Sequence, residues 1–263
     1  MIIEETKTKI KKVKKIKEEQ KEKILSVDRQ VENKKAKKDG FGITIEEMTE
    51  KGLCLGHQVS KLNPKMSGYI TGIKNDIHII NLEKTAVCLE KALKFISELV
   101  KENKTILMVG TKPALKNLIQ ETAQECNFPY IVERWLGGYF TNFKNVFERV
   151  KSYRELQEQK EKGELERFIK KERIRAEKKL VKMGKKFEGI KNLEKLPDAV
   201  FICDIKQNQL TLKEAKMKEV KVVAIVDTNV DPTAVDFPIP ANDGSIPSVK
   251  YILDKIKQAV KYE

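Results

Sequence analysis

The sequence predicts an α/β fold in which a mostly parallel sheet is flanked by helices on both faces. Short apolar runs of strand length alternate along the chain with amphipathic stretches of helix length, which is the pattern of βαβ units. Residues 141–189 interrupt this alternation because they contain no strand-like run. We therefore expect an α/β domain with right-handed crossovers and an inserted helical segment.

The first predicted elements lie before residue 104. Thr44 and Glu47 have the spacing of a capping box, which predicts a short helix toward Lys51. The next segment, CLGHQVSKLNPKMSGYI, has no clean period and predicts irregular backbone. YITGI and IHIINL predict a β-pair, in which His78 is expected to be a strand residue. Residues 82–103 have the apolar spacing of a helix.

The remaining elements complete the sheet and its helical layers. Apolar runs predict strands at residues 105–110, 130–132, 198–205 and 221–227, and a short last strand that ends with FPIPAND. Amphipathic segments predict helices at residues 113–126, 211–219 and 247–260.

Residues 141–189 predict two antiparallel helices, a coiled-coil hairpin that projects from the α/β domain. Lys162-Gly163 is the expected turn, and we expect the apolar residues of the narrow seam to pack against one another. The seam positions are Phe143, Val146, Phe147, Val150, Tyr153 and Leu156, then Leu165, Phe168, Ile169, Ile174 and Leu180. The chain thus divides into an N-terminal extension at residues 1–40, an α/β domain at residues 41–140 and 190–263, and the hairpin at residues 141–189.

The net charge of +14 is concentrated in two segments. Residues 1–40 carry 14 Lys and Arg against 8 Asp and Glu, and residues 151–195 carry 16 against 9. The rest is nearly neutral, with 23 basic and 22 acidic residues. Such segments favour a polyanionic partner, nucleic acid before an anionic membrane, although each is also compatible with a solvated charged surface. We expect the extension to be disordered alone, with helix formation on binding as an alternative.

Several classes of protein are disfavoured. No apolar run approaches the roughly 20 residues that cross a bilayer, and the N-terminus lacks the apolar region of a secretory signal. The four cysteines are far apart and form no C-x-x-C, which is typical of reduced thiols in a cytosol-like compartment.

Two clusters stand at predicted carboxyl ends of strands, where open α/β sheets bind ligands. Lys112 lies between a strand and a helix N-terminus able to hold a phosphate, but no glycine-rich nucleotide motif accompanies it. Asp227, Asp231, Asp236 and Asp243 surround the last two strands, where they either hold Mg²⁺, or Zn²⁺ with a histidine, or cap turns. The main alternative function is therefore an enzyme that acts on a nucleotide or phosphorylated metabolite through Lys112, Asp227 and Asp231.

The loop before the hairpin, ERWLGGYFTNF, combines aromatic and basic residues. Such a loop is able to stack on unpaired bases. Its aromatic residues are equally able to anchor the root of the hairpin, which is the role we favour for Trp135.

Six segments resemble the bacterial-type second protein of the small ribosomal subunit, a universal family. They are LGHQVSKLNPKMSGYI, IHIINLEKT, ILMVGTK, RWLGGYFTNF, GIKNLEKLPDAVFICD and AIVDTNVDPTAVDFPIPANDGSIPSV. The resemblance runs in order from about Met48 to Tyr251, with residues 1–40 outside it. It implies a flavodoxin-like or Rossmann-like domain with an inserted helical hairpin. It also implies a structural, non-catalytic protein of the ribosome in the cytoplasm, with an organellar ribosome left open.

The resemblance further implies partners and sites. Members lie on the solvent side of the small subunit where head meets body, clamp ribosomal RNA helices of both, and help dock the OB-fold ribosomal protein that captures messenger RNA. For this chain it implies a structural Zn²⁺ or Mg²⁺ held by His57, Asp227, Asp231 and Asp243, with no cofactor required. Cys54 departs from the family, in which many members have a second histidine there.

Residues predicted to contact RNA come from three segments. They are Lys61, Asn63 and Lys65; Arg134, Asn142 and Lys144; and Lys170, Lys171, Arg173, Arg175, Lys178, Lys179 and Lys182. We expect mainly electrostatic contacts with phosphates, in which RNA shape and not base sequence selects the site. Binding of the basic helices to a membrane surface is the last alternative.

Overall fold

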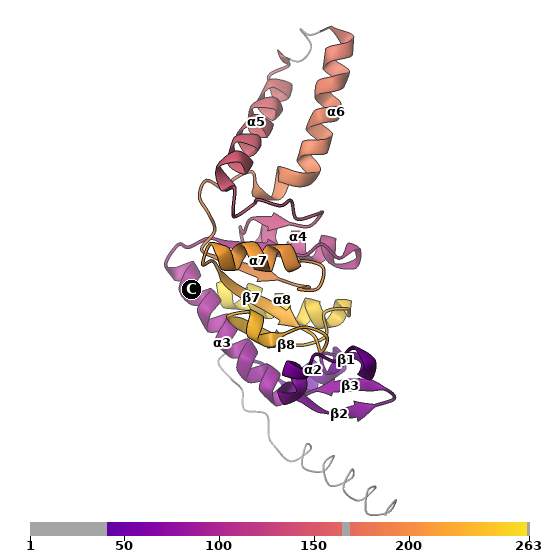
Figure 1. Cartoon of the computed structure of the whole chain (residues 1–263). Coiled ribbons are helices and arrows are strands. Elements are labelled where there is room, and N and C mark those ends of the chain that lie inside the picture. Colours follow the sequence, from indigo (N-terminus) through magenta and orange to yellow (C-terminus); the bar gives the residue numbers. More distant parts are fainter. Residues whose placement is uncertain (1–40, 165–168, 262–263) are drawn as a thin grey trace, which may run out of the picture. The chain divides into compact units, whose positions relative to one another are not determined.

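The structure is a computed structural model that describes residues 41–164 and 169–261 (Figure 1). The predicted extension at residues 1–40 and the seam residues Leu165 and Phe168 lie outside the described residues. Within the described residues, no helix combines the length and the apolar character needed to span a membrane.

A five-stranded parallel sheet forms the centre of the fold. Its strands are β4 (Ile106–Val109), β5 (Tyr130–Ile131), β6 (Ala199–Ile202), β7 (Lys221–Val226) and β8 (Phe237–Pro240). They lie in the order β5-β4-β6-β7-β8. Counted within this sheet alone, that order is 2-1-3-4-5, which is the flavodoxin-like order. The predicted α/β class and its parallel sheet are therefore confirmed.

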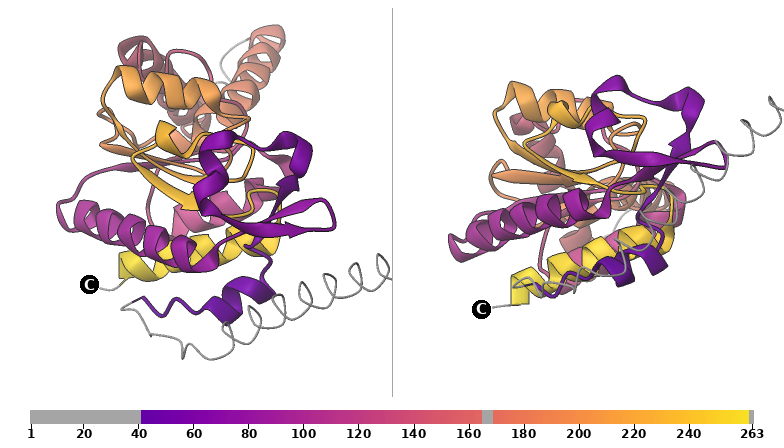
Figure 2. Two further views of the ribbon diagram at one scale, coloured as in Figure 1. Left: turned by 60° about the horizontal axis from the view of Figure 1, so that its bottom comes forward. Right: turned by 90° about the horizontal axis from the view of Figure 1, so that it is seen from below.

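Helices cover both faces of this sheet, because its strands alternate their side chains between two apolar clusters. One cluster joins the sheet to α3 (Leu82–Lys101), α4 (Lys116–Glu125) and α8 (Ile246–Lys261). The other joins it to α7 (Gln209–Met217) and to the base of the helical hairpin. In Figure 2 the sheet lies between α7, in orange, and the pair α3 and α8, in magenta and yellow.

A second, antiparallel sheet has the strand order β1-β3-β2. The predicted β-pair is confirmed as β2 (Ile70–Lys74) and β3 (Ile77–Ile80), and His78 is a buried strand residue. Asn75 and Asp76, which connect these two strands, both have positive φ, as a tight two-residue hairpin turn requires. The third strand, β1 (Leu55–Gln58), falls in the segment for which the sequence predicts irregular backbone. That expectation is wrong for four residues, because a strand can be defined by a distant partner without having a period of its own.

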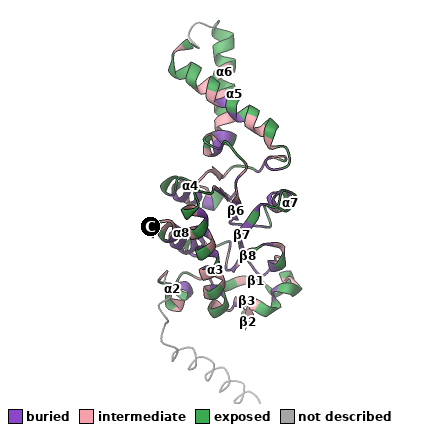
Figure 3. Cartoon of the chain, turned by 90° about the vertical axis from the view of Figure 1, so that its left-hand side faces the viewer, coloured by how far each residue is buried: buried purple, intermediate pink, exposed green. Residues whose placement is uncertain are grey.

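The inserted segment forms two helices, α5 (Phe143–Glu161) and α6 (Lys170–Phe187). Lys162 caps α5, and Gly163 adopts φ +71° directly after it, as expected of the turn. Val150, Tyr153 and Phe187 at the base are buried, whereas the distal turns are exposed (Figure 3). Ile169 and Ile174 are 74% and 39% exposed, so the expectation that the seam residues all pack against one another is wrong for the distal hairpin.

The first described helix, α2 (Ile45–Glu50), confirms the predicted helix but not its capping box. Thr44 is the N-cap residue, yet its side chain accepts no hydrogen bond from the first turn. Its hydroxyl is buried and has no partner within the described residues. Burial of Met48 against the core, and not reciprocal capping, is what stabilises this short helix.

Candidate functional site

His57, Asp227 and Asp243 form a compact group at the carboxyl edge of the parallel sheet. Asp227 directly follows β7 and Asp243 follows β8, and these strands are parallel neighbours. His57 comes from β1 of the other sheet. Its Nδ1 lies 3.0 Å from Oδ2 of Asp227, and one ligand atom from each residue lies within 4.8 Å of the others. The chain thus brings together three of the four residues that the resemblance implied as metal ligands.

The hydrogen bonds of this group constrain the tautomer of His57. The side-chain nitrogen Nδ2 of Asn229 lies 3.1 Å from Nε2 of His57. If Asn229 donates to Nε2, the ring proton is on Nδ1 and points at Asp227. Oδ1 of Asp227 also accepts hydrogen bonds from the backbone N–H and the hydroxyl of Thr228, at 2.6 and 3.2 Å. In that tautomer His57 carries no positive charge to set against the carboxylate of Asp227.

The charge balance of the group fits a divalent cation. Asp204, Asp227 and Asp243 are almost fully buried, and Lys112 is the ammonium that contacts two of them. Burial raises the pKa of Asp243, and the charges of Asp204 and Asp227 act in the same direction against the hydrogen bond from Lys112. Oxygen and imidazole donors suit Zn²⁺, and the carboxylates suit Mg²⁺. The residues present therefore fit the implied metal.

Asp231 lies apart from this group. Its carboxylate accepts from Nζ of Lys65 at 2.6 Å and from the backbone and hydroxyl of Thr233 at 2.9 and 2.6 Å. The hydrogen bond from Lys65, with those from Thr233, lowers the pKa of Asp231 to about 2. Asp231 instead caps the turn at Pro232, which is the alternative role that the sequence left open for this cluster.

The segment that contains Lys61, Asn63 and Lys65 lies against the end of β7. The backbone N–H of His57 donates to the hydroxyl of Thr228 at 2.9 Å, and that of Asn63 to the Thr228 carbonyl at 2.9 Å. A Cβ at Gly56 would lie 2.5 Å from Cγ2 of Thr228, so this close approach requires glycine. The segment that appeared irregular in the sequence therefore touches the loop after β7 and positions His57 there.

Lys112 occupies the topological switch point between β4 and β6, where flavodoxin-like sheets bind ligands. Its ammonium donates to Oδ1 and the backbone oxygen of Asp243, at 2.9 and 3.1 Å, and lies 3.0 Å from Oδ2 of Asp204. Burial alone lowers its pKa, but the hydrogen bonds and charges of Asp243 and Asp204 together raise it. All three ammonium protons are engaged, so none remains for a substrate phosphate.

Glu214 of α7 fixes the loop before the hairpin and is a residue that the sequence analysis missed. Oε1 accepts from the indole of Trp135 at 3.3 Å and from the N–H of Gly138 at 2.8 Å. Oε2 accepts from the N–H groups of Phe140 and Thr141 at 3.0 and 3.4 Å. The signal in the sequence was the spacing of Glu214, which lies three positions after Thr211. This spacing places both residues on the same inward face of α7. Its buried position becomes evident only once the orientation of α7 is known.

The aromatic residues of this loop anchor the hairpin and are not available to stack on bases. Trp135, Tyr139 and Phe140 are all buried, and both other rings lie within about 5 Å of the Trp135 ring, at 4.8 and 5.0 Å. The hydroxyl of Tyr139 donates to the carbonyl of Lys186 in α6 at 3.0 Å. Of the two roles left open for the loop, the structure favours anchoring.

The basic residues predicted to contact RNA are exposed. Those of the hairpin all lie on α6, in the order Lys170, Lys171, Arg173, Arg175, Lys178, Lys179 and Lys182. Arg173 lies 3.8 Å from Glu177, and Lys65 binds Asp231. Within the described residues, the other predicted cations, including Lys61, Arg134 and Lys144, make no ion pair.

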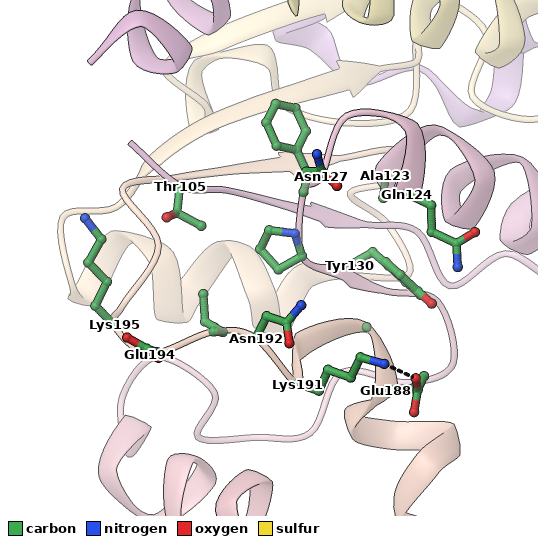
Figure 4. A pocket seen from close by; sticks show the side chains of 14 residues that line it. Thr105, Ala123, Gln124, Asn127, Tyr130, Glu188, Lys191, Asn192, Glu194 and Lys195 are labelled. Atoms are coloured by element: carbon green, nitrogen blue, oxygen red, sulfur yellow. Dashed lines mark hydrogen bonds and ion pairs between the residues drawn. The ribbon is translucent and has the colours of Figure 1, made fainter. Parts of the chain in front are cut away.

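A cavity of about 980 Å³ lies away from these residues, at the amino ends of the parallel strands (Figure 4). Thr105 precedes β4, Pro129 precedes β5, and Lys195 precedes β6. Lys191 and Glu188 form an ion pair of 2.8 Å on its wall. Because ligands of open α/β sheets bind at the opposite edge, this cavity does not mark the ligand site expected of the fold.

Comparison with known protein families decides the assignment. The family model described as ribosomal protein S2 matches residues 48–262, from α2 through the hairpin to α8. The chain belongs to this family. It is 41% identical over 218 residues to the small ribosomal subunit protein uS2 of Coprothermobacter proteolyticus, covering 83% of this chain and 81% of that protein. It is 42% identical to the protein of the same name from Dictyoglomus thermophilum, covering 83% and 89%.

Membership in this family confirms that the chain is a structural component of the small ribosomal subunit and not an enzyme. The alternative of a phosphate-handling enzyme is therefore set aside, in agreement with the fully engaged Lys112. The family also implies a ribosome-associated protein, with ribosomal RNA and other ribosomal proteins as the class of partner.

Proposed function

We propose that the chain binds ribosomal RNA through the cationic face of α6, supported by Lys61 and the loop residues Arg134, Asn142 and Lys144. The observation that supports this most strongly is the row of exposed cations on α6, of which only Arg173 has an ion-pair partner among the described residues. Free cations on a helix release counterions when they meet phosphates, so affinity should fall steeply with salt. The α/β domain serves as a rigid mount for this helix.

The proposed location is the solvent side of the small subunit, at the junction of head and body. There the chain would clamp RNA helices of both and help to dock the OB-fold ribosomal protein that captures messenger RNA. A cytoplasmic ribosome is the setting we propose, and the relatives give no support for an organellar one. The chain consists of a nearly neutral α/β domain and a basic hairpin. This arrangement supports the proposed role because a clamp needs two separate surfaces.

We also propose that His57, Asp227 and Asp243 hold one structural Zn²⁺ or Mg²⁺. A bound cation would tie β1 to the ends of β7 and β8 and so fix the segment of residues 54–70. The expected result is a higher melting temperature on adding Zn²⁺ or Mg²⁺ to chelator-treated protein, and no such rise in His57→Ala. An equal rise in both proteins would exclude this site.

The RNA-binding proposal is tested by reversing charge on α6. The triple variant Lys171→Glu, Arg175→Glu, Lys178→Glu should reduce association with small subunits by about tenfold or more, because six units of charge change at the contact. The measurement is co-sedimentation in sucrose gradients. The matched control reverses three exposed lysines of the α/β domain, Lys91, Lys216 and Lys250. Equal association of both triple variants would exclude α6 as the main RNA contact.

A further inference from the structure

A groove of about 710 Å³ lies at the root of the hairpin. Arg149 and Ser152 of α5 line one side, and residues of α6 between Arg175 and Phe187 line the other. Leu136, from the loop that Glu214 holds in place, lies between them. Its volume is in the range of about 300–1,000 Å³ that accommodates small organic ligands, so a nucleotide is an appropriate size.

The groove is lined by six cations, namely Arg149, Arg175, Lys178, Lys179, Lys182 and Lys186. Among the described residues that line it, none is acidic. Each of the six is exposed, and within the described part of the chain none makes an ion pair. Two of them, Arg149 and Lys186, were not among the predicted RNA contacts. The electrostatic complement of such a groove is an anion with several charges.

The inner surface between these cations is apolar. Leu136 and Met183 are partly exposed there, and the buried Phe187 closes the floor. Ser152 is the sole uncharged polar side chain among the described residues of the lining. A purely ionic contact with phosphates leaves such a surface unused, whereas a ligand with an apolar face beside its phosphates uses both.

We infer that this groove binds unpaired nucleotides of RNA, with phosphates on the six cations and base faces against Leu136 and Met183. This inference rests on the proposed RNA-binding function and specifies the form of RNA. A duplex hides its base faces in the stack, so it gains nothing from the apolar surface, whereas a single strand presents them. Because no amide side chain lines the groove, we expect little preference between adenine and uracil.

The test compares a single-stranded RNA decamer with a ten-base-pair RNA duplex, using fluorescence anisotropy at fixed salt. Charge alone favours the duplex, since it carries twice the phosphates per length. Tighter binding of the single strand therefore reports the apolar surface. The expected result is a preference for the single strand, with adenine-rich and uracil-rich decamers binding within about threefold of each other.

The variant Met183→Gln makes the surface polar while it keeps side-chain length and helix propensity. It should weaken binding of the single strand about fourfold, equivalent to one buried methylene, and leave the duplex and the salt dependence unchanged. Val181→Gln is the matched control, because Val181 is 60% exposed on the same helix and does not line the groove. Melting temperatures establish that both variants are folded.

The outcomes separate this inference from the proposed function. Equal effects of Met183→Gln and Val181→Gln, or a preference for the duplex, would overturn the groove assignment even if small-subunit RNA still binds. Loss of binding to small-subunit RNA by the unaltered chain would overturn the proposed function itself. Binding of a labelled acidic amphipathic peptide of alternating Leu and Glu, with binding of neither RNA, would assign the groove to a protein neighbour and overturn the inference.

Discussion

At the scale of single residues, Glu214 shows how one buried carboxylate positions a functional element. Its two oxygens accept four hydrogen bonds from the loop between β5 and α5, three of them from backbone N–H groups. One side chain can hold so many donors because a carboxylate accepts at both oxygens, and the burial of Trp135, Tyr139 and Phe140 adds to this anchoring. The hairpin root and the groove beside it therefore depend on a residue of α7.

Replacement of Glu214 by alanine should leave these buried donors without an acceptor. We expect a loss of about 3 kcal/mol in the free energy of unfolding, and a fall of about 6–12 °C in melting temperature. Trp135 is the single tryptophan, so a red shift of its fluorescence reports the loosened loop directly. Glu121→Ala, at an exposed site on α4, is the control. Unchanged fluorescence in Glu214→Ala would contradict the proposed clamp.

Asp236 gives a prediction for the pH dependence of stability. Burial by itself raises its pKa, but the N–H of Val222 and the ammonium of Lys221, both at 2.9 Å, lower the pKa below its ordinary value. Such a carboxylate stabilises the folded state above its unfolded pKa of about 3.9, and that stabilisation is lost as the pH falls through the lower folded pKa.

The stability difference between the unaltered chain and Asp236→Asn should therefore be constant from about pH 7 to pH 5 and shrink below about pH 4. Urea unfolding at a series of pH values measures it. A difference that grows as the pH falls would show that the pKa of Asp236 is raised in the folded state, and not lowered.

At the scale of elements, the turn after α5 begins with a backbone conformation that favours glycine. Gly163 adopts φ +71° and has no atom within 4 Å of a built Cβ, so the constraint is on the backbone and not on space. A side chain in this left-handed region costs about 1–2 kcal/mol, less for asparagine.

Gly163→Ala should therefore destabilise the end of the hairpin by about 1 kcal/mol, and Gly163→Asn by less. Hydrogen exchange of the α5 backbone measures the change locally. Gly68→Ala is the control, because Gly68 also has open space around it but lacks a positive φ. Equal exchange in Gly163→Ala and Gly163→Asn would indicate that φ does not limit this turn.

At the scale of the whole molecule, side chains of the chain itself occupy the switch point at which this strand order usually binds a ligand. Lys112, Asp204 and Asp243 fill the switch point with ion pairs, and a Cβ at Gly110 would lie 1.9 Å from Cδ1 of the buried Ile119, which would have to move. The cationic surface is instead on the inserted hairpin, which contains the basic helix α6, whereas the α/β domain is nearly neutral.

At high salt, which screens the exposed cations of the hairpin groove, ATP or GTP should therefore shift the melting temperature by less than about 1 °C relative to Mg²⁺ alone, because the Lys112 ammonium has no proton free for their phosphates. Small-subunit ribosomal RNA should raise the melting temperature at low salt, and the rise should disappear at high salt. Differential scanning fluorimetry with Mg²⁺ as the baseline separates the effect of a nucleotide from the effect of RNA. A nucleotide shift that persists at high salt would show that Lys112 can exchange its partners.

Much of the fold was predictable because local pattern determines it. Buried parallel strands such as β4 and β7 are continuous apolar runs, and α3 and α8 have helical spacing, so each was evident within its own segment. β1 was not, because its four residues become a strand only by pairing with β3. The same limit applies to Thr44, whose cap depends on the exact path of the chain before α2.

The α/β class, the helical insertion, the concentration of positive charge and the family follow from the sequence alone, since period, composition and ordered motifs are properties of the chain. Tertiary structure alone decided which charges meet: Asp243 and not Asp231 joins His57 and Asp227, and Lys112 is bound to carboxylates. It also placed Glu214 beneath the hairpin root. The physical reason is that hydrogen bonds and ion pairs act over about 3 Å, and the distances between residues far apart in the chain are defined only by packing.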